Sequence, residues 1–577
     1  MSYLFGQRRW VPLLTAVLLA AGACDDGASV SWDGGTGADT DTDADTDTDV
    51  DTDTDSDTDT DSDADGGPDA AACIVDPERV LDDVAFLASE ELGGREAGTE
   101  GNELAMQMAE GVFEELGLEP VGDDGTYRQV FSYSKEDFLS PPTVALDGDA
   151  LAGGEEYIFL FGTGVANLTE EIVYVGYGMT VPAYDPAAYP DCPLPAAGYD
   201  DFEGIDVTGK VALVLTNGPA DDETVLTTCP DSDLCGADSC LWAPWYKAAN
   251  ADLHGAAAMI LVQSYANPPG ISYLASVADY TIADFASLWA ERGVMEAAVP
   301  SLEAWSGGID DAYEPNPQVT GVEASISMSM GTVDVSTANV LGAIPGTDPE
   351  LGDEVVVVGG HIDHLGNTVG LYPGADDNAS GSAVTLELAR LIRECANPAR
   401  TVVFALWNGE EDGLHGSMHY AFGDPVYPLG STIAAYSVDM VGAGDDTNLV
   451  LYGATDDANA WLGQVMEGSA ADMGFGWAVT PGEVIYGSDH APFTFFSVPA
   501  VCAMSGALET HPSYHTPLDT SDAIGLSTLE MSASMMYAGL KPLVEGTEEI
   551  YLTSGKEMIR AAAPVRVDPD SPIYRKR

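Results

Sequence analysis

The sequence predicts an α/β protein, with a mixed, mostly parallel sheet covered by helices on both faces and a smaller β-rich insert. After residue 335, apolar and β-branched runs alternate with a helical pattern, as in Glu354–Val358, Ser380–Arg393 and Thr401–Trp407. Between residues 140 and 310, strand-like runs are separated by long Gly-, Pro- and Asp-rich loops. The chain has 577 residues, 45% of them hydrophobic, which is enough for several folded units.

The elements can be placed in order along the chain. Residues 77–116 predict two helices around the turn Leu92-Gly93-Gly94-Arg95, and a short extended piece is expected to follow at Thr126–Phe131. Three strand-like runs fall in the insert, and two more strands are expected in the main sheet; these are Ile172–Val175, Val211–Leu215, Ala257–Val262, Thr432–Met440 and Val498–Met504. We therefore expect residues 73–140 and 311–548 to form one domain around an insert at 141–310, with a tail at 549–577.

The N-terminus has the pattern of an export signal. Arg8 and Arg9 precede an apolar run too short to span a bilayer, and small residues lead to Cys24. We expect residues 1–23 to be a signal peptide and Cys24 to carry a lipid, although Ala21 stands where lipoproteins usually have Leu. Cleavage without lipidation and a twin-arginine route are the alternatives. The protein is expected at a bacterial cell envelope or outer surface, or otherwise secreted.

The chain has 96 Asp and Glu residues against 19 Lys and Arg residues, which gives a formal net charge of −77. Residues 25–69 contain 18 Asp and no Lys or Arg, so we expect residues 24–72 to form a disordered tether. Such a charge disfavours binding to nucleic acid and to anionic membranes. Export permits disulfides among the eight Cys, with two bridges possible within Cys192, Cys229, Cys235 and Cys240. A zinc site from these four is less favoured, and Cys395 and Cys502 are expected to be buried thiols.

Polar side chains follow the predicted strands of the main sheet at the points where those strands end. They occur in His361-Ile362-Asp363-His364, Asp376-Asp377-Asn378, Glu410-Glu411, Asp439, Ser488-Asp489-His490 and Tyr514-His515. Seven of the eight His fall between residues 361 and 515. Ligands bind at the carboxyl ends of parallel strands, and several buried carboxylates together usually surround a cation. Imidazole and carboxylate ligands without Cys suit zinc in a hydrolytic site.

This ordered set resembles the co-catalytic di-zinc aminopeptidases, a family of zinc exopeptidases that includes secreted bacterial leucyl aminopeptidases. The resemblance implies two zinc ions per chain, one held by His361 and Asp439 and the other by Glu411 and His515, with Asp376 bridging both. It also implies a cis bond between Asp376 and Asp377. The insert resembles the protease-associated domain, through Tyr199-Asp200-Asp201-Phe202-Glu203-Gly204 and the segment from Lys247 to Val262.

The resemblance also implies catalytic roles. Glu410 would act as general base toward a metal-activated water that attacks the peptide carbonyl. Asp363 would orient His361, and Tyr514 would hydrogen-bond the developing oxyanion. The substrates would be peptides or proteins, cleaved at the N-terminal residue.

The remaining polar residues near these motifs have structural interpretations. His364 is expected behind the ligands or at the surface, and His415 and His419 at the surface. Asp489-His490 would stabilise a loop, His511 would be a loop residue, and Asp519 would orient His515 or cap a turn.

Three other functions remain open. A carboxypeptidase or dipeptidase of the same superfamily would need basic groups for a carboxylate, and few stand near the motifs. Glutaminyl cyclase uses one zinc, which the presence of both His361 and Asp439 disfavours. A receptor-like binding protein with a dead peptidase fold would have lost ligands, and none is lost here.

Overall fold

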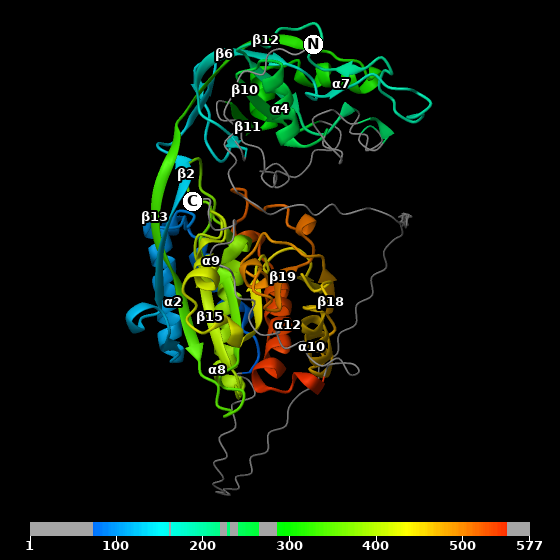
Figure 1. The fold of residues 1–577 in the computed structure, drawn as a ribbon. Helices are drawn as coiled ribbons and strands as arrows, with labels where there is room; N and C mark the ends of the chain where they lie inside the picture. Colours follow the sequence, from blue (N-terminus) through cyan, green and yellow to red (C-terminus); the bar gives the residue numbers. More distant parts are fainter. Residues whose placement is uncertain are drawn as a thin grey trace, which may run out of the picture.

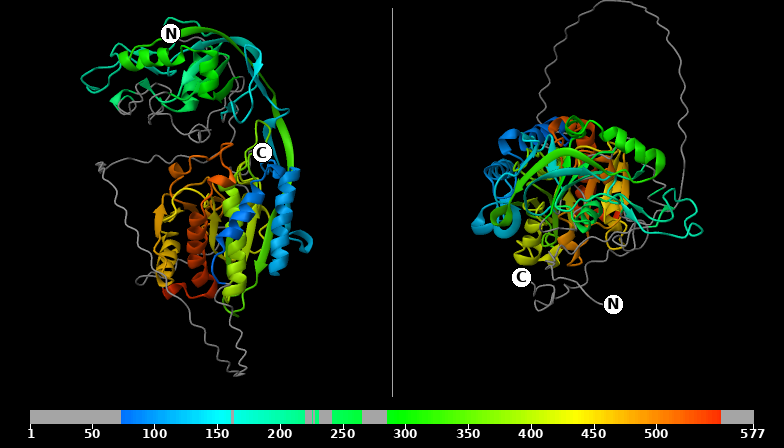
Figure 2. Two further views of the ribbon diagram at one scale, coloured as in Figure 1. Left: turned by 180° about the vertical axis from the view of Figure 1, so that it is seen from behind. Right: turned by 90° about the horizontal axis from the view of Figure 1, so that it is seen from above.

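A computed structural model describes residues 73–160, 163–219, 225, 228–230, 241–264 and 285–550. Two units stand one above the other, joined by a long pair of strands along one side (Figure 1). The view from above shows the smaller unit lying over the larger one (Figure 2). The expected signal peptide, Cys24, the acidic tether, Cys235, Cys240 and nearly all of the tail lie outside the described residues. None of the described helices has the length and apolar character needed to cross a membrane.

Within the described residues, the larger unit is built on a nine-stranded sheet of order β1-β13-β15-β14-β16-β19-β17-β18, with β2 also paired to β13. The strands are β1 Glu119–Pro120, β2 Arg128–Phe138, β13 Met330–Ile344, β14 Val355–His361, β15 Thr401–Trp407, β16 Thr432–Val438, β17 Asn448–Tyr452, β18 Ala478–Gly482 and β19 Ala500–Ser505. The four central strands β15, β14, β16 and β19 are parallel, and β13 and β17 flank them antiparallel. The sheet is mixed, as the sequence predicts, but only its centre is mostly parallel: β1, β2 and β15 pair antiparallel with β13, and β17 pairs antiparallel with β19, so parallel and antiparallel strand pairs are equally common.

Helices cover both faces of this sheet, with the long ones on one face. The helices are α1 Pro77–Leu87, α2 Glu100–Leu116, α8 Gly381–Cys395, α9 His415–Met418, α10 Ala460–Asp472, α11 Ala491–Thr494 and α12 Leu526–Glu545. The helices α1, α2, α8, α10 and α12 share one apolar core with the sheet. The other face packs against shorter elements around Trp407, Tyr420 and Phe493, whose rings form a cluster. Burial on both faces explains why the central strands read as continuous apolar runs.

The smaller unit contains an eight-stranded sheet of order β4-β3-β12-β6-β9-β10-β11-β5 in the described residues. Its strands are β3 Thr143–Leu146, β4 Asp149–Ala150, β5 Tyr157–Phe159, β6 Ala166–Tyr174, β9 Val211–Leu215, β10 Ala258–Val262, β11 Ala286–Ala290 and β12 Gln318–Met328, with the separate pair β7 Thr180–Val181 and β8 Tyr199–Asp200. The helices α4 Pro244–Leu253, α6 Arg292–Ala298 and α7 Leu302–Ala312 accompany them.

The end of the insert lies later in the chain than the expected boundary at residue 310. Strand β12 pairs with β3 and β6 of the smaller sheet, so the insert extends to Met328. The next strand, β13, leaves this unit and pairs with β2 along its length before reaching the main sheet. Strands β2 and β13 are therefore the physical connection between the two units (Figure 1).

The described cysteines form two disulfides. One joins Cys192 to Cys229, a pairing that the sequence left open. The other joins Cys73 to Cys395, so the expectation of a buried thiol at Cys395 is wrong. The sequence context of Cys395 is apolar because it ends helix α8, but that helix end lies beside the residues preceding α1, where Cys73 can reach it. Cys502 is a buried free thiol, as expected.

Candidate metal centre

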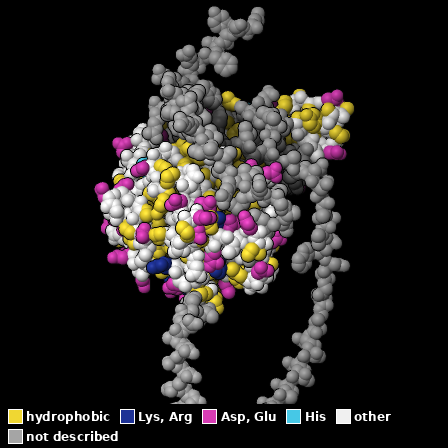
Figure 3. Space-filling view, turned by 60° about the horizontal axis from the view of Figure 1, so that its bottom comes forward, with side chains coloured by type: hydrophobic (Ala, Val, Ile, Leu, Met, Phe, Trp, Pro, Cys, Tyr) yellow, Lys and Arg dark blue, Asp and Glu magenta, His cyan; other side chains and the backbone are white. Residues whose placement is uncertain are grey.

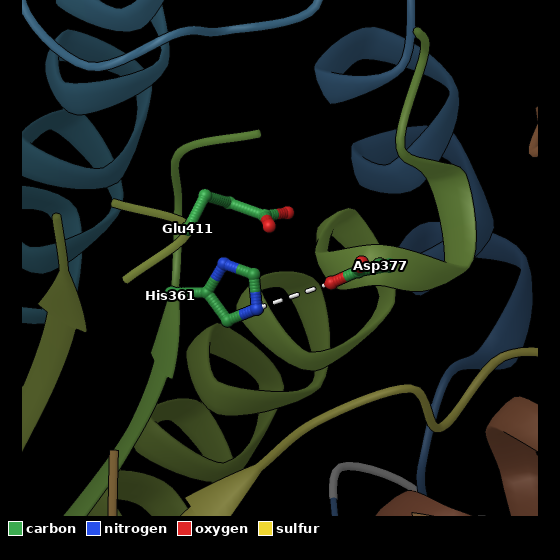
Figure 4. A group of neighbouring side chains, drawn as sticks. All are labelled: His361, Asp377 and Glu411. Carbon is green, nitrogen blue, oxygen red and sulfur yellow. Dashed lines mark ion pairs between the residues drawn. The ribbon is translucent and has the colours of Figure 1, made fainter. Parts of the chain in front are cut away.

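The strand ends of the main sheet bring the predicted polar residues together. His361 is the last residue of β14, Glu410 and Glu411 follow β15, and Asp439 follows β16. Because β14, β15 and β16 are parallel and in register, these side chains emerge at one edge of the sheet. Asp377 comes from a π-helical turn, Ala375–Ser380, that precedes α8. Figure 4 shows the carboxylate of Asp377 directed at the imidazole of His361, with Glu411 beside them.

One group of ligand atoms surrounds the imidazole of His361. Its Nε2 lies 3.2 Å from Oδ1 of Asp377, 3.5 Å from Oδ1 of Asp439 and 4.0 Å from Oε2 of Glu410. The other oxygen of Asp439 accepts a 2.7 Å hydrogen bond from the Ser488 hydroxyl, while its Oδ1 is buried without a hydrogen-bond partner. The Oδ1 atom of Asp439, which accepts no hydrogen bond, is thus the oxygen that lies toward His361.

A second group forms around His515. Its Nε2 lies 3.0 Å from Oδ2 of Asp377 and 3.0 Å from Oε2 of Glu411. The other Glu411 oxygen is 2.6 Å from Nδ1 of His364. Asp377 therefore points one carboxylate oxygen at each histidine and stands between the two groups. His515 has a left-handed backbone with φ of 54°, an uncommon conformation for a residue with a side chain.

Asp376, the expected bridge, does not enter either group. Its Oδ1 accepts hydrogen bonds from the backbone N–H groups of Gly442 and Ala443, each at 2.9 Å. Its Oδ2 lies 2.6 Å from Nδ1 of His511. These contacts turn the side chain of Asp376 toward the loop after β16, and the place between the histidines belongs to Asp377.

The expected cis bond is displaced by the same single residue. It joins Asp377 to Asn378 and not Asp376 to Asp377. The backbone of both aspartates is fixed from the other side, because the Asp519 carboxylate accepts hydrogen bonds from the N–H groups of Asp376 and Asp377 at 2.9 and 3.0 Å. Asp519 thus positions this turn, one of the two roles expected of it.

Asp363 acts mainly on the glutamate loop. Its two carboxylate oxygens accept the backbone N–H groups of Glu410 and Glu411 at 3.2 and 3.3 Å. Nδ1 of His361 lies 3.2 Å from the main-chain oxygen of Asp363 and 3.9 Å from its carboxylate. The His361 ring is therefore oriented by the backbone of Asp363, while the Asp363 side chain fixes the two glutamates.

Tyr514 stacks on the adjacent ring of His515, with ring centres 3.8 Å apart. Burial, together with the negative charges of Asp377 and Glu411, holds the pKa of Tyr514 well above its usual value. The phenol is therefore protonated at neutral pH and available as a hydrogen-bond donor.

Other polar residues support the site from behind. The Asp489 carboxylate accepts a hydrogen bond from Ser417, and burial raises its pKa to about 7. His490 Nε2 faces the main-chain oxygen of Ile485, as expected of a residue that stabilises a loop. His415 stacks on Tyr133, with ring centres 3.8 Å apart. His364 and His511 are buried, and each contacts a carboxylate of this region; His511 had no motif around it to mark this role.

Electrostatics shows how unfavourable the cluster is without a cation. Burial opposes charge on His361, but Glu410 and Asp439 outweigh it and hold the His361 pKa well above its usual value. Burial also opposes charge on His515, yet Glu411 and Asp377 raise its pKa to about 10. Burial raises the pKa of Glu410 well above its usual value. Positive charge is thus required among these carboxylates, supplied by protons or by metal.

The donor set fits zinc. Zinc binds imidazole nitrogen and carboxylate oxygen at about 2.0–2.2 Å, so ligands on one tetrahedral ion lie about 3.3–3.6 Å apart. The 3.5 Å separation of His361 from Asp439 falls in this range, and the separations of 3.2 Å from His361 to Asp377 and 3.0 Å around His515 are slightly shorter. Two overlapping sets of three ligand atoms each meet the geometric requirement for a metal ion, namely His361, Asp377 and Glu411, and His361, Glu410 and Asp439.

Comparison with known proteins finds a family that is similar to this part of the chain. Residues 339–539 match the model of peptidase family M28. Over these residues the chain is similar to the M28 peptidases, and we call the larger unit the M28 domain. The match begins in β13 and ends within α12, covering the strand ends described above.

The M28 domain is similar to several curated proteins. Over 220 residues the chain is 29% identical to aminopeptidase YwaD of Bacillus subtilis, covering 37% of this chain and 46% of that protein. Over 105 residues it is 38% identical to an aminopeptidase of Pseudomonas aeruginosa strain PAO1, covering 18% and 19%. Over 144 residues it is 31% identical to a probable glutamate carboxypeptidase of Arthroderma benhamiae, covering 24% and 19%. Each match spans less than half the length of the relative.

Solved structures share the fold over most of the chain. An aminopeptidase from Aneurinibacillus sp. strain AM-1 aligns with a TM-score of 0.50 at 22% identity, covering 82% of this chain and 94% of that one. A zinc aminopeptidase from Bacillus subtilis aligns with a TM-score of 0.53 at 19% identity, covering 81% and 95%. These alignments show the fold of the M28 zinc aminopeptidases.

Proposed function

We propose that this protein is a two-zinc aminopeptidase that removes N-terminal residues from peptides. The observation that carries the proposal is the position of Asp377, whose two carboxylate oxygens face His361 and His515 at 3.2 and 3.0 Å. A carboxylate shared in this way is the arrangement that holds two metal ions about 3.5–4 Å apart.

The residues divide between the two proposed ions. His361 and Asp439 would hold one zinc, Glu411 and His515 the other, and Asp377 would bridge them. Bound zinc supplies Lewis acidity toward a carbonyl and lowers the pKa of water. Asp363 keeps the glutamates in place through their N–H groups, and Ser488 keeps Asp439 in place through its hydroxyl.

The chain's own groups would move the protons. We assign Glu410 as the general base, because it is adjacent to the ligands while its neighbour Glu411 is turned to His515 and His364. Glu410 would take a proton from the attacking water and return it to the leaving amine. The Tyr514 phenol, kept protonated by its surroundings, would donate a hydrogen bond to the developing oxyanion.

The negative charge of the site favours binding of the amino end of a peptide over binding of its carboxyl end. The site is rich in carboxylates, which attract a protonated amine. Two cations behind the site loops are already engaged: Arg95 by main-chain oxygens, and Lys135 by Glu96, Asp137 and Asp412. A carboxypeptidase needs a cationic group that receives the substrate carboxylate, and the similarity to a glutamate carboxypeptidase keeps this as the second candidate.

Three further proposals concern the rest of the chain. The insert is proposed to be a protease-associated domain, because this β-rich unit contains both resembling segments, one beginning in β8 and the other spanning α4 and β10. The protein is proposed to be exported and anchored through a lipid on Cys24. Its partners are proposed to be peptide substrates, with no nucleic acid, since the surface view in Figure 3 shows many acidic and few basic side chains.

Metal content and substrate choice test the proposed function. The purified full-length protein should contain about two zinc ions per chain. Glu410→Gln should retain zinc and lose about 10²- to 10⁴-fold in kcat, the usual contribution of a general base. Amino-acid anilides with a free amine should be cleaved, whereas N-acetylated analogues and peptides that offer only a free carboxyl end should not.

The outcomes separate the alternatives. Less than one zinc per chain, or full activity of Glu410→Gln, would contradict the mechanism. Cleavage of N-blocked peptides from the carboxyl end would replace the aminopeptidase by a carboxypeptidase. Stable zinc binding without turnover of either class would favour a binding protein.

A further inference from the structure

The Gly-rich turn before α2 carries a buried cation that the proposed chemistry does not use. Arg95 is fully buried in a left-handed backbone conformation with φ of 50°. Its guanidinium donates to Ile362 O at 3.0 Å, to Leu87 O at 2.5 Å, to Pro373 O at 2.7 Å and to Gly374 O at 2.9 Å. No described carboxylate forms a salt bridge with it. All of these bonds go to main-chain oxygens, which is an unusual use of a buried arginine.

The oxygens that accept hydrogen bonds from Arg95 show which parts of the chain this side chain joins. Ile362 is the residue after His361, and Gly374 lies three residues before Asp377. The guanidinium therefore joins the two ends of the segment 362–374, which connects the histidine of one proposed ion to the bridging carboxylate. A planar group with donors in a fixed fork sets the distance between these two backbones more rigidly than a flexible ammonium can.

The backbone of the same turn reinforces this connection. His364 N–H donates to the main-chain oxygen of Arg95 at 3.3 Å, and Gly366 N–H donates to that of Gly94 at 3.0 Å. A Cβ on Gly94 would lie 2.3 Å from Gly366 O and 2.5 Å from Tyr372 O, so the two backbones touch directly. The turn and the segment thus form one packed unit along the segment's length.

Charge gives Arg95 a second effect on the site. Burial lowers its pKa to about 10, and the nearby carboxylates of Asp519, Asp377 and Asp363 oppose that decrease. The group therefore remains positively charged at neutral pH. It supplies one fixed positive charge beside the carboxylates without occupying their oxygens, which remain available to metal.

We propose that Arg95 is a positioning residue for the metal centre, fixing His361 relative to Asp377 through the segment 362–374. The inference rests on the proposed function, because it concerns how that site is held for zinc. A residue that orients ligands without touching the metal typically contributes about 10- to 100-fold to metal affinity.

The test compares two buried arginines of the same domain. Arg95→Lys keeps the charge but loses the fork, so the zinc affinity of the full-length protein, measured by competition with a chelator, should fall about 10- to 100-fold. The control is Arg400→Lys. Arg400 is 2% exposed and bonds Leu543 O, Glu354 and Glu548 at the opposite end of β15. This variant should lose stability and keep the zinc affinity of the wild type.

If Arg95→Lys does not fold, a second pair of variants with smaller changes can replace it. Gly93→Ala places a methyl 3.0 Å from the Asn367 side chain at φ of 54°, whereas Gly125→Ala has φ of 76° and no neighbour within 4 Å. Both carry the strain of a left-handed alanine, but only Gly93→Ala should weaken zinc binding.

The results distinguish the two levels of the hypothesis. A wild-type protein that binds no zinc contradicts the proposed function. A wild type that binds zinc, together with a folded Arg95→Lys of equal zinc affinity, overturns only the role of Arg95. A fall in melting temperature without a change in zinc affinity also overturns it, since that result is a purely structural effect.

Discussion

At the scale of single residues, the choice between Asp376 and Asp377 shows what a sequence motif can and cannot specify. The strand-end residues His361, Glu411 and Asp439 are predictable, because polar residues directly follow the apolar runs that form the buried strands. The two aspartates lie in an irregular turn between Gly374 and α8, where no periodicity applies. Only the hydrogen bonds to Asp519 and to the loop after β16 decide which carboxylate faces the histidines.

The two aspartates give a matched pair of variants. Asp377→Asn removes the charge shared between His361 and His515, so zinc content should fall to one ion per chain or less. Asp376→Asn should keep the wild-type zinc content and lose about 1–3 kcal/mol of stability, because its hydrogen bonds to Gly442 and Ala443 are weakened in a buried position. Metal analysis and thermal unfolding measure the two effects. Zinc loss in Asp376→Asn with normal zinc in Asp377→Asn would restore the assignment drawn from the sequence.

At the scale of elements, the sequence predicts the buried strands well and the exposed connecting strands poorly. Strand β15 lies at its expected position, because every residue from Thr401 to Trp407 is buried and apolar or β-branched. Strand β2 reaches Phe138, well beyond the short piece at 126–131 in the sequence pattern. Its second half alternates polar residues on a partly exposed ribbon, so hydrophobic periodicity contains little information there.

This connecting strand also reaches the loop that carries Glu410 and Glu411. The Tyr133 hydroxyl donates to Oδ2 of Asp412, and Lys135 Nζ lies 3.2 Å from Oδ1 of the same carboxylate. Asp412 directly follows Glu411, and Tyr133 also stacks on His415 beyond it. Strand β2 thus holds the glutamate loop through Asp412 and His415.

Tyr133→Phe should loosen that loop while preserving the ring stacking. The loss of one hydrogen bond to a charged group corresponds to about 1.5–3 kcal/mol at most, and less here because Lys135 remains bound to Asp412. We expect a several-fold lower kcat with unchanged zinc content, since none of the ligands is removed. Thr332→Val on the paired strand β13, whose hydroxyl bonds the exposed Glu136, is the control and should leave kcat unchanged. Equal kcat in Tyr133→Phe and the wild type would show that β2 is only a connector.

At the scale of the whole molecule, the packing of the insert on the M28 domain is the feature that the sequence could not predict. Gly153 and Gly154 of the insert lie against Val369 and Gly370, which belong to the segment between His361 and Asp377. Val369 packs on one apolar core of the insert, and Tyr372 packs on another. Contacts between two loops rich in glycine follow no periodic pattern, so only the three-dimensional structure reveals them.

This contact predicts that the insert and the metal-site segment move as one body. A Cβ on Gly370 would lie 2.5 Å from Cα of Gly154 and 2.6 Å from O of Gly153, so Gly370→Ala forces the two backbones apart. The rate of backbone hydrogen exchange should rise both near residues 153–157 and in residues 362–374. The kcat/KM should fall, because residues 362–374 connect His361 to Asp377.

The control is Gly476→Ala, which adds a methyl with no neighbour within 4 Å in the same domain. It should leave exchange and kcat/KM unchanged. If Gly370→Ala raised exchange in the insert alone, with residues 362–374 and kcat/KM as in the wild type, the insert would be an independently attached unit. Coupled changes in both regions would instead show that the position of the insert is transmitted to the residues between His361 and Asp377.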